Sequence, residues 1–287
     1  MKIFRKPTLE LIVEAVHMRF GCCSNMLSSG PGKTGAEIVE KLAMAGFEYI
    51  ELSLVDCMAL SLPDRKALAK RLENSGLRSE VVNSFFPREC KTTGPDADPE
   101  KIRAWYREAL DLAKELGAET VVYGSPYSKS YPLGFSRETA MEQLIRLHQE
   151  LDEYAQSVDL TILIEPCHRF ECNLINTFAE GVELADAVGG KRTKVLFDYY
   201  HFFRNGETLD ALRKYGAEYL DHIHFACPFH PGEPERTFPK DRNEWAYGPF
   251  LQTVKAIGYD GRVSIEAFCK DLDGQVQKSL ILLKELF

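Results

Sequence analysis

Short apolar runs, many of them rich in β-branched residues, alternate along the chain with longer stretches in which apolar residues recur at the helical period. A short run of this kind is typical of a buried strand, and a longer periodic stretch is typical of an amphipathic helix. Eight such runs predict strands at 19–23, 49–54, 79–84, 120–125, 160–165, 194–199, 221–226 and 262–268.

The stretches between the runs end as helices do. The one at 99–117 follows Asp98, begins with Pro99 and closes at Gly117. Aspartate is a good N-cap residue, proline is favoured in the first turn of a helix, and glycine stops a helix readily. Three more predicted helices span 35–46, 64–76 and 137–157.

Regular alternation of strands and helices from end to end predicts an α/β protein. Eight strand–helix units fit a single (β/α)8 TIM barrel covering residues 1–287, with residues 1–16 as a short N-terminal extension. A doubly wound open sheet is the structural alternative. The turn after the first strand lacks the GxGxxG spacing, and "GPGKTG" is not a phosphate-binding P-loop, which disfavours a nucleotide-binding sheet.

Composition narrows the classes of function. The formal charge of −8 disfavours a nucleic-acid partner, because phosphate backbones are bound chiefly by clustered Lys and Arg. No run of 18 apolar residues occurs, and Glu10 and Glu14 interrupt the first apolar stretch. We therefore expect a cytoplasmic protein that does not span a membrane. The eight cysteines form no CxxC pair, and we expect reduced, mostly buried thiols.

Four successive predicted strands, the fifth to the eighth, each end on or near a residue that can bind a metal: Glu165, Asp198, His224 and Glu266. In a barrel the carboxyl ends of neighbouring strands converge, so these side chains should meet. Three carboxylates held so close would repel one another, and a divalent cation removes that conflict. Oxygen donors with one imidazole suit Mn²⁺, Mg²⁺ or Co²⁺. Any one of them alone is more often a helix cap or a surface charge.

These residues lie within a recognisable pattern. The segment "EPCHRFECNLINT" at 165–177 resembles the E-P-x-N-R-[FY]-E…N-T motif of the ketose 3-epimerases, the D-tagatose and D-psicose 3-epimerase group of the xylose isomerase-like TIM barrel superfamily of sugar isomerases and epimerases. "FDYYH" at 197–201, "HIHFA" at 222–226 and "GYDGRVSIEAF" at 258–268 resemble that family's later motifs in order and kind. The similarity is strongest over residues 119–268.

The resemblance implies roles for individual residues. The four residues above match the family's metal ligands, and Glu165 and Glu266 match its pair of proton-transferring glutamates. Glu171 and His201 match the two residues that hydrogen-bond the sugar near its carbonyl.

Two positions depart from the family pattern. His168 stands where asparagine is usual, and His230 stands where an arginine six residues after the metal histidine is usual. Both positions face the substrate in the family, so we include His168 and His230 among the expected substrate contacts. The departures bear on the identity of the substrate more than on the type of reaction.

The function so implied is a divalent-metal-dependent sugar epimerase, with Mn²⁺ preferred, that moves a proton next to a ketose carbonyl through an enediolate. Ketose 3-epimerisation by a homodimer or homotetramer is the first expectation. Sibling enzymes with the same chemistry stay open: an aldose–ketose isomerase, an inosose dehydratase, or a subunit that cleaves 3-oxo C-glycosides. An endonuclease-like DNA-repair enzyme and a non-catalytic sugar-binding or metal-binding protein are lesser alternatives.

Other residues carry weaker signals. His222 shares a strand face with His224 and is expected to be structural. Glu51 should point into the barrel, either as a buried hydrogen-bonded carboxylate or as a substrate contact. His17 and His148 are expected at the surface. The candidates for the pocket wall are Asn83, Phe86, Trp105 and Tyr123, and the basic residues that could bind a phosphorylated substrate are Arg236, Lys240 and Arg242.

Overall fold

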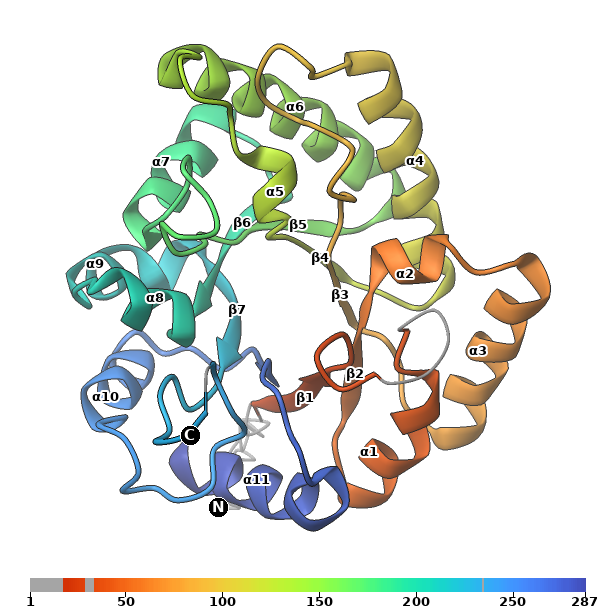
Figure 1. Cartoon of the computed structure of the whole chain (residues 1–287), viewed down its shortest axis with the longest axis vertical. Coiled ribbons are helices and arrows are strands. Elements are labelled where there is room, and N and C mark those ends of the chain that lie inside the picture. The colour runs from red at the N-terminus through yellow and green to blue at the C-terminus, as the bar shows by residue number, and fades with distance from the viewer. Residues whose placement is uncertain (1–17, 29–33, 234) are drawn as a thin grey trace, which may run out of the picture.

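Eight parallel strands pair in the order of the sequence, and the last pairs with the first, so that the sheet closes into a barrel (Figure 1). The computed structural model of the chain describes residues 18–28, 34–233 and 235–287. The strands are β1 (Arg19–Cys23), β2 (Tyr49–Ser53), β3 (Val81–Asn83), β4 (Thr120–Tyr123), β5 (Thr161–Ile164), β6 (Thr193–Asp198), β7 (Leu220–Phe225) and β8 (Arg262–Ile265).

Helices connect the strands and form a ring outside the barrel (Figure 1). They are η1 (Ala36–Ile38), α1 (Val39–Ala45), α2 (Leu54–Met58), α3 (Leu62–Ser75), α4 (Pro99–Glu115), α5 (Pro126–Lys129), α6 (Arg137–Val158), α7 (Phe178–Val188), α8 (Tyr199–Asn205), α9 (Asp210–Tyr219), α10 (Gly248–Ala256) and α11 (Leu272–Leu286). Asp98 caps α4 as expected, because its carboxylate accepts from the backbone N–H groups of Glu100 and Lys101.

The core has two layers. One large cluster lies between the strands and the helices, and a second cluster of Tyr49, Val81, Val122, Leu163 and Leu196 is separate from it. These five residues come from β2 to β6, and they fill the interior of the barrel, as packed side chains do in this fold. Tyr49 fits because Gly21 faces it, since a Cβ at Gly21 would lie 2.1 Å from the tyrosine ring.

The structure confirms the closed (β/α)8 barrel, the eight predicted strands and the four predicted helices. Five strands are shorter than expected: β2 by one residue, β4 and β5 by two, and β3 and β8 by three. β3 stops at Asn83 because Ser84 adopts a left-handed backbone conformation with φ of 51°. β8 stops at Ile265, and beyond it Phe268 pairs instead with Thr237. The predicted extension at 1–16 lies outside the described residues. No helix in the described ranges is long and apolar enough to cross a membrane.

Candidate metal centre

The four predicted ligands occupy the carboxyl ends of four neighbouring strands. Asp198 ends β6 and His224 lies in β7, while Glu165 and Glu266 each follow directly after the last residue of β5 and β8. Side chains two residues apart on a strand share a face. Leu163 and Leu196 fill the barrel interior, so Glu165 and Asp198, two residues further along, also point inward above that layer.

The structure brings all four together. Their ligand atoms lie within 4.8 Å of one another, and all four residues are buried. His224 Nδ1 lies 3.1 Å from Glu165 Oε1, 3.1 Å from Glu266 Oε2 and 3.8 Å from Asp198 Oδ2. One imidazole nitrogen therefore faces oxygens of three carboxylates.

Glu51 determines which nitrogen of His224 faces the carboxylates. Its carboxylate is fully buried, and Oε1 lies 2.8 Å from His224 Nε2 while Oε2 lies 3.0 Å from His222 Nε2. The hydroxyl of Ser264 donates to the same carboxylate at 2.7 Å. A proton on His224 Nε2 satisfies Glu51 and leaves the lone pair of Nδ1 for a cation. The placement of His222 agrees with its expected structural role, and that of Glu51 with a buried hydrogen-bonded carboxylate.

The cluster perturbs the ionisation of its members. Burial raises the pKa of Asp198 above its usual range. Burial would also raise the pKa of Glu266, but the charges of Arg236 and His224 outweigh it and hold that pKa well below the usual range. For His224, burial opposes protonation, yet the charges of Glu51 and Glu266 raise its pKa well above the usual value. The negative charges of the nearby carboxylates therefore stabilise a positive charge at this position.

This donor set fits a divalent cation. Three carboxylates and one imidazole match the ligands that Mn²⁺, Mg²⁺ or Co²⁺ accept, and the set has no thiolate. Glu266 Oε2 makes no aligned hydrogen bond, although Arg236 Nη1 lies 2.8 Å away, so this buried oxygen is under-satisfied. A bound cation would satisfy it and would compensate the repulsion among the carboxylates.

Two neighbours fix the position of Glu165. A Cβ at Gly124 would lie 2.0 Å from Glu165 Oε2, so the carboxylate packs against a strand end that has no side chain. The buried Lys129 donates from Nζ to the backbone carbonyl of Glu165 at 2.5 Å. The glycine after β4 and the lysine of α5 therefore hold the end of β5.

A cavity of about 650 Å³ opens over the cluster. Its lining includes Glu165 and Glu266, together with Glu171 and His201. Asp198 and His224 are not part of this lining. A molecule in the cavity would therefore meet the two glutamates of the cluster first.

The remaining predicted contacts separate into two groups. Glu171 and His201 line the cavity, and burial lowers the pKa of His201 to about 4. His168 lies behind them, with Nε2 3.1 Å from Glu171 Oε1 and its backbone N–H donating to His201 Nδ1 at 3.2 Å. His230 does not line the cavity, and its Nδ1 lies 3.2 Å from the carbonyl oxygen of Pro231 in its own loop.

Arg236 is a residue of the site that the family spacing, an arginine six residues after the metal histidine, did not predict. It lies twelve residues after His224, is 6% exposed and lines the cavity. Its Nη1 lies 2.8 Å from Asp198 Oδ2 and 2.8 Å from Glu266 Oε2, and its guanidinium carbon is 4.8 Å from the centre of the Tyr200 ring. The buried cation beside the cluster is thus supplied by a later position in the loop after β7 than the one that the resemblance implied.

The proposed phosphate-binding trio does not converge. Arg236 is engaged by the two carboxylates, whereas Lys240 and Arg242 are exposed and lie outside the cavity lining. Of the candidates for the wall, Asn83 and Phe86 line the cavity and Trp105 and Tyr123 do not.

One histidine contradicts its expectation. His148 was expected at the surface, but it is 1% exposed on α6 and stacks on Tyr123 with a ring separation of 5.2 Å. Its position on the apolar face of a long helix explains the burial. His17 lies outside the described residues. All eight cysteines are free, and six of them are buried.

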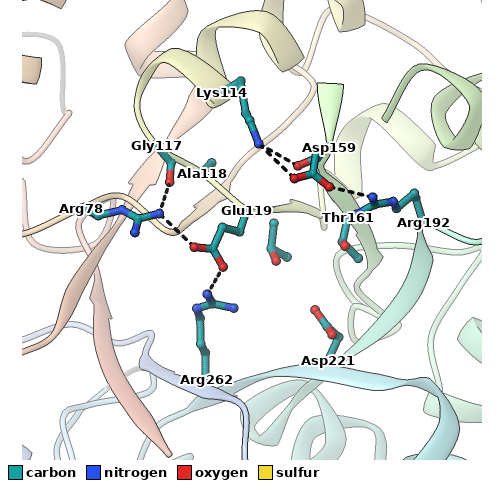
Figure 2. Close-up of a pocket in the computed structure, with 11 residues that line it drawn as sticks. Arg78, Lys114, Gly117, Ala118, Glu119, Asp159, Thr161, Arg192, Asp221 and Arg262 are labelled. Atoms are coloured by element: carbon teal, nitrogen blue, oxygen red, sulfur yellow. Dashed lines mark hydrogen bonds and ion pairs between the residues drawn. The ribbon is translucent and has the colours of Figure 1, made fainter. Parts of the chain in front are cut away.

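A second cavity, of about 450 Å³, lies at the opposite end of the barrel (Figure 2). Its four basic residues pair with acidic ones. Arg78 and Arg262 both contact Glu119, and Lys114 and Arg192 both contact Asp159 (Figure 2). Shared ion pairs at this amino-terminal face indicate a structural network, because catalysis in such barrels occurs at the other face.

Known proteins resemble this chain in sequence and in fold. A family profile described as xylose isomerase-like TIM barrel matches residues 39–286. A D-psicose 3-epimerase of Ruminiclostridium cellulolyticum is 24% identical over 253 residues, covering 86% of this chain and 83% of that protein.

Two solved structures share the fold. The D-allulose 3-epimerase from Methylomonas sp. in complex with D-allulose superposes with a TM-score of 0.79 at 20% identity, covering 94% of this chain and 98% of that one. The 3-keto-D-glucoside 4-epimerase from E. coli gives a TM-score of 0.73 at 17% identity, covering 93% and 99%.

Proposed function

We propose, from the premise that this chain belongs to the xylose isomerase-like TIM barrel family, that it is a divalent-metal-dependent epimerase of ketose sugars, most simply a ketose 3-epimerase. The relatives that span most of its length are epimerases and isomerases, and the chain is an enzyme of that kind. The observation that carries the proposal is the convergence of Glu165, Asp198, His224 and Glu266 beneath a cavity of sugar size.

The cation is expected to be held by those four residues, with His224 binding through Nδ1. Bound there, it would polarise the carbonyl of an α-hydroxy ketone and so acidify the neighbouring C–H bond. Mn²⁺ is the ion we expect first, followed by Mg²⁺ and Co²⁺.

Glu165 and Glu266 move the proton in this proposal. Both reach the cavity lining, and they come from strands β5 and β8, on either side of β6 and β7. One glutamate, ionised, removes the proton from the carbon next to the carbonyl, and the other, protonated, donates its own proton to the opposite face of the enediolate. The centre is thereby inverted. General acid–base catalysis of this kind contributes about 10²–10⁴-fold to the rate.

The polar side chains around the pair orient the sugar. Glu171 accepts hydrogen bonds from hydroxyl groups, and the neutral imidazole of His201 can donate to or accept from an oxygen near the carbonyl. Arg236 supplies positive charge beside Asp198 and Glu266, which favours negative charge developing on the substrate oxygen. His168 supports Glu171 from behind.

Deuterium uptake tests the reaction directly. The Mn²⁺-loaded protein is incubated in D₂O with a panel of ketoses, and NMR identifies the carbon that exchanges. Exchange at C3 with inversion is the expected result. Exchange at C1 or C2 with aldose formation would indicate an isomerase, and loss of a leaving group would indicate a lyase or dehydratase.

Removing either glutamate tests the two-base scheme. We expect Glu165→Gln and Glu266→Gln to reduce kcat by at least about 100-fold, since each variant loses its proton-transferring group. Circular dichroism and a Mn²⁺ titration check that each variant is folded and metal-loaded. A loaded variant with near-normal kcat would refute the scheme.

The proposal also includes the cytoplasmic location expected from the sequence, and a homodimer or homotetramer, which the family resemblance suggests. Sedimentation velocity of the purified protein measures the second. A DNA-repair function has less support, because the formal charge of the chain is −8 and phosphate backbones are bound chiefly by clustered Lys and Arg.

A further inference from the structure

The two arginines that line the cavity over the metal cluster differ in their partners. Arg236 lies beside Asp198 and Glu266, with Nη1 2.8 Å from an oxygen of each. Arg88 makes no ion pair with a carboxylate in the described part of the chain, and its guanidinium carbon lies 4.1 Å from the centre of the Tyr127 ring. Of these two cations, only Arg88 therefore keeps a charge that a ligand in the cavity can neutralise.

Arg88 lies across the mouth of the barrel from the metal cluster. It belongs to the loop after β3, whereas the four expected ligands come from the ends of β5 to β8. In a closed barrel of eight strands in sequence order, β3 is opposite β7, which carries His224. The cavity continues from the cluster to residues that follow β1, β2, β3 and β4. A substrate whose ketone end meets the cation therefore extends its other end toward the side on which Arg88 lies.

Hydrogen bonds hold the loop of Arg88 against the segment after β4. The backbone N–H of Phe86 donates to Ser125 Oγ at 2.9 Å, and Lys91 Nζ donates to the carbonyl of Tyr127 at 2.7 Å. These contacts flank Arg88 in the sequence. Tyr127 also lines the cavity, and stacking on its ring orients the guanidinium plane while the N–H groups at the edge stay available to a ligand.

The chain turns sharply at both strand ends beside this loop. Ser84 follows β3 with φ of 51°, and Ser125 lies after β4 with φ of 36°. Both serines line the cavity. A left-handed conformation is costly for a residue other than glycine, and residues held in it are concentrated at binding and catalytic sites. The backbone that presents Arg88 and Tyr127 thus has the character of a binding site.

A single arginine at this end suits a carboxylate better than a doubly charged phosphate. The edge of a guanidinium presents two parallel N–H donors, which match the two oxygens of a carboxylate. Asp56, which follows β2, also lines the cavity and makes an interaction of its own. Glu89 is exposed and lies outside the lining. The described lining holds no second unpaired arginine or lysine for a second negative charge.

We infer that Arg88 binds a carboxylate at the end of the substrate chain remote from the ketone, so that the site takes keto-sugar acids. The inference rests on the proposed function, because it names the substrate class of the same site. The α-hydroxy ketone end lies over the metal cluster, and the carboxylate lies against the guanidinium that Tyr127 supports.

Substrates that differ at the terminal carbon test the assignment. Deuterium uptake next to the carbonyl is followed by NMR with the Mn²⁺-loaded protein on D-fructose, on D-fructose 6-phosphate and on D-fructuronate, in which the terminal CH₂OH is replaced by a carboxylate. We expect kcat/KM for the acid to exceed that for D-fructose by at least about fivefold, through a lower KM. The advantage should shrink at high salt, because the guanidinium is exposed.

Three variants localise the effect. Arg88→Met removes the charge and keeps an unbranched side chain, and it should remove the advantage of the acid. Arg88→Lys keeps the charge without the planar fork and should retain part of the advantage. Arg242→Met is the matched control, since Arg242 is also exposed but lies outside the cavity lining. This control should leave the acid-to-ketose ratio unchanged.

The outcomes separate the inference from the proposed function. An acid-to-ketose ratio that is the same in the wild type and in Arg88→Met overturns the role of Arg88 and leaves the proposed function standing. A larger gain for the phosphate ester than for the acid, lost in Arg88→Met, overturns the assignment to a carboxylate.

If no ketose of the panel and neither anion exchanges, the proposed function fails. Isothermal titration calorimetry with D-fructuronate and D-fructose then judges the role of Arg88 by itself. Tighter binding of the acid that is lost in Arg88→Met supports that role, and equal binding of the acid to the wild type and to Arg88→Met overturns it.

Discussion

At the residue scale, Glu51 uses both of its carboxylate oxygens to position two histidines inside the barrel, one oxygen for each histidine. Its Oε1 lies 2.8 Å from Nε2 of His224, while Oε2 lies 3.0 Å from Nε2 of His222. We expect Glu51→Gln to weaken Mn²⁺ binding by about 10–100-fold, because the amide neutralises the carboxylate and leaves one histidine without an acceptor. Isothermal titration calorimetry measures the dissociation constant.

Glu80→Gln is the matched control for that experiment. Glu80 is also buried, but it pairs with Arg19 and Arg262 at the amino-terminal end of the barrel, with closest distances of 2.6 Å and 2.8 Å. This variant should lose stability and keep its Mn²⁺ affinity. Equal metal affinities for Glu51→Gln and wild type would rule out the positioning role of Glu51.

His148 gives the protein a pH-dependent stability at the residue scale. Burial lowers the pKa of His148 to about 3, with the charge of Lys129 acting in the same direction, whereas an unfolded histidine titrates near pH 6.5. Between these values the unfolded chain binds the extra proton, so stability is full above about pH 6.5 and falls as the pH is lowered. This one group contributes a slope of up to about 1.4 kcal/mol per pH unit.

Urea unfolding at pH 7, 6 and 5 measures that slope. His148→Phe keeps a ring on Tyr123 and removes the titrating group, and the free energy of unfolding should then fall less steeply between pH 6 and pH 5. Identical slopes for the variant and the wild type would contradict a buried neutral histidine.

At the scale of elements, Gly124 at the end of β4 leaves the space that the carboxylate of Glu165, at the end of β5, occupies. A Cβ at Gly124 would lie 2.0 Å from Glu165 Oε2, and the flexible end of the glutamate would have to move aside. We expect Gly124→Ala to fold normally and to lose at least about tenfold in Mn²⁺ affinity, since the ligand is displaced while the backbone is kept.

Gly248→Ala tests whether that loss is specific. Gly248 begins α10, and a Cβ there meets nothing within 4 Å. This control should bind Mn²⁺ as the wild type does. A Gly124→Ala variant with unchanged affinity would show that Glu165 does not need this position to act as a ligand.

The elements themselves could be predicted because their signals are local and periodic. The apolar runs located all eight strands, and Asp98 with Gly117 located the ends of α4 to within two residues. The loops carry no such period. The family spacing therefore pointed to His230, six residues after His224, whereas the loop after β7 brings Arg236 to the cluster.

For the whole molecule, metal binding and folding are coupled, because the four ligands come from strands β5 to β8 and meet only in the closed barrel. Mn²⁺ at about 100 times its dissociation constant should add about 2.7 kcal/mol of stability. For a domain of this size that corresponds to a rise of several degrees in Tm, at about 2–4 °C per kcal/mol, measured by calorimetry with and without EDTA.

Asp198→Asn should abolish this rise. The amide oxygen can still cap α8, where Asp198 Oδ1 accepts from the N–H groups of Tyr200 and His201 at 2.6 Å and 3.0 Å, while the ligand charge is lost. A full Mn²⁺-dependent rise in this variant would exclude Asp198 from the site.

The sequence by itself determined the barrel, the order of its strands and the four residues that converge at its rim, because strand periodicity points alternate side chains inward and a closed parallel sheet brings the strand ends together. Only the tertiary structure decided that Glu51 holds His224, that Arg236 neutralises Asp198 and Glu266, and that a cavity of about 650 Å³ opens over the cluster. These features depend on contacts between residues far apart in the chain and on the path of an irregular loop, neither of which leaves a periodic trace in the sequence.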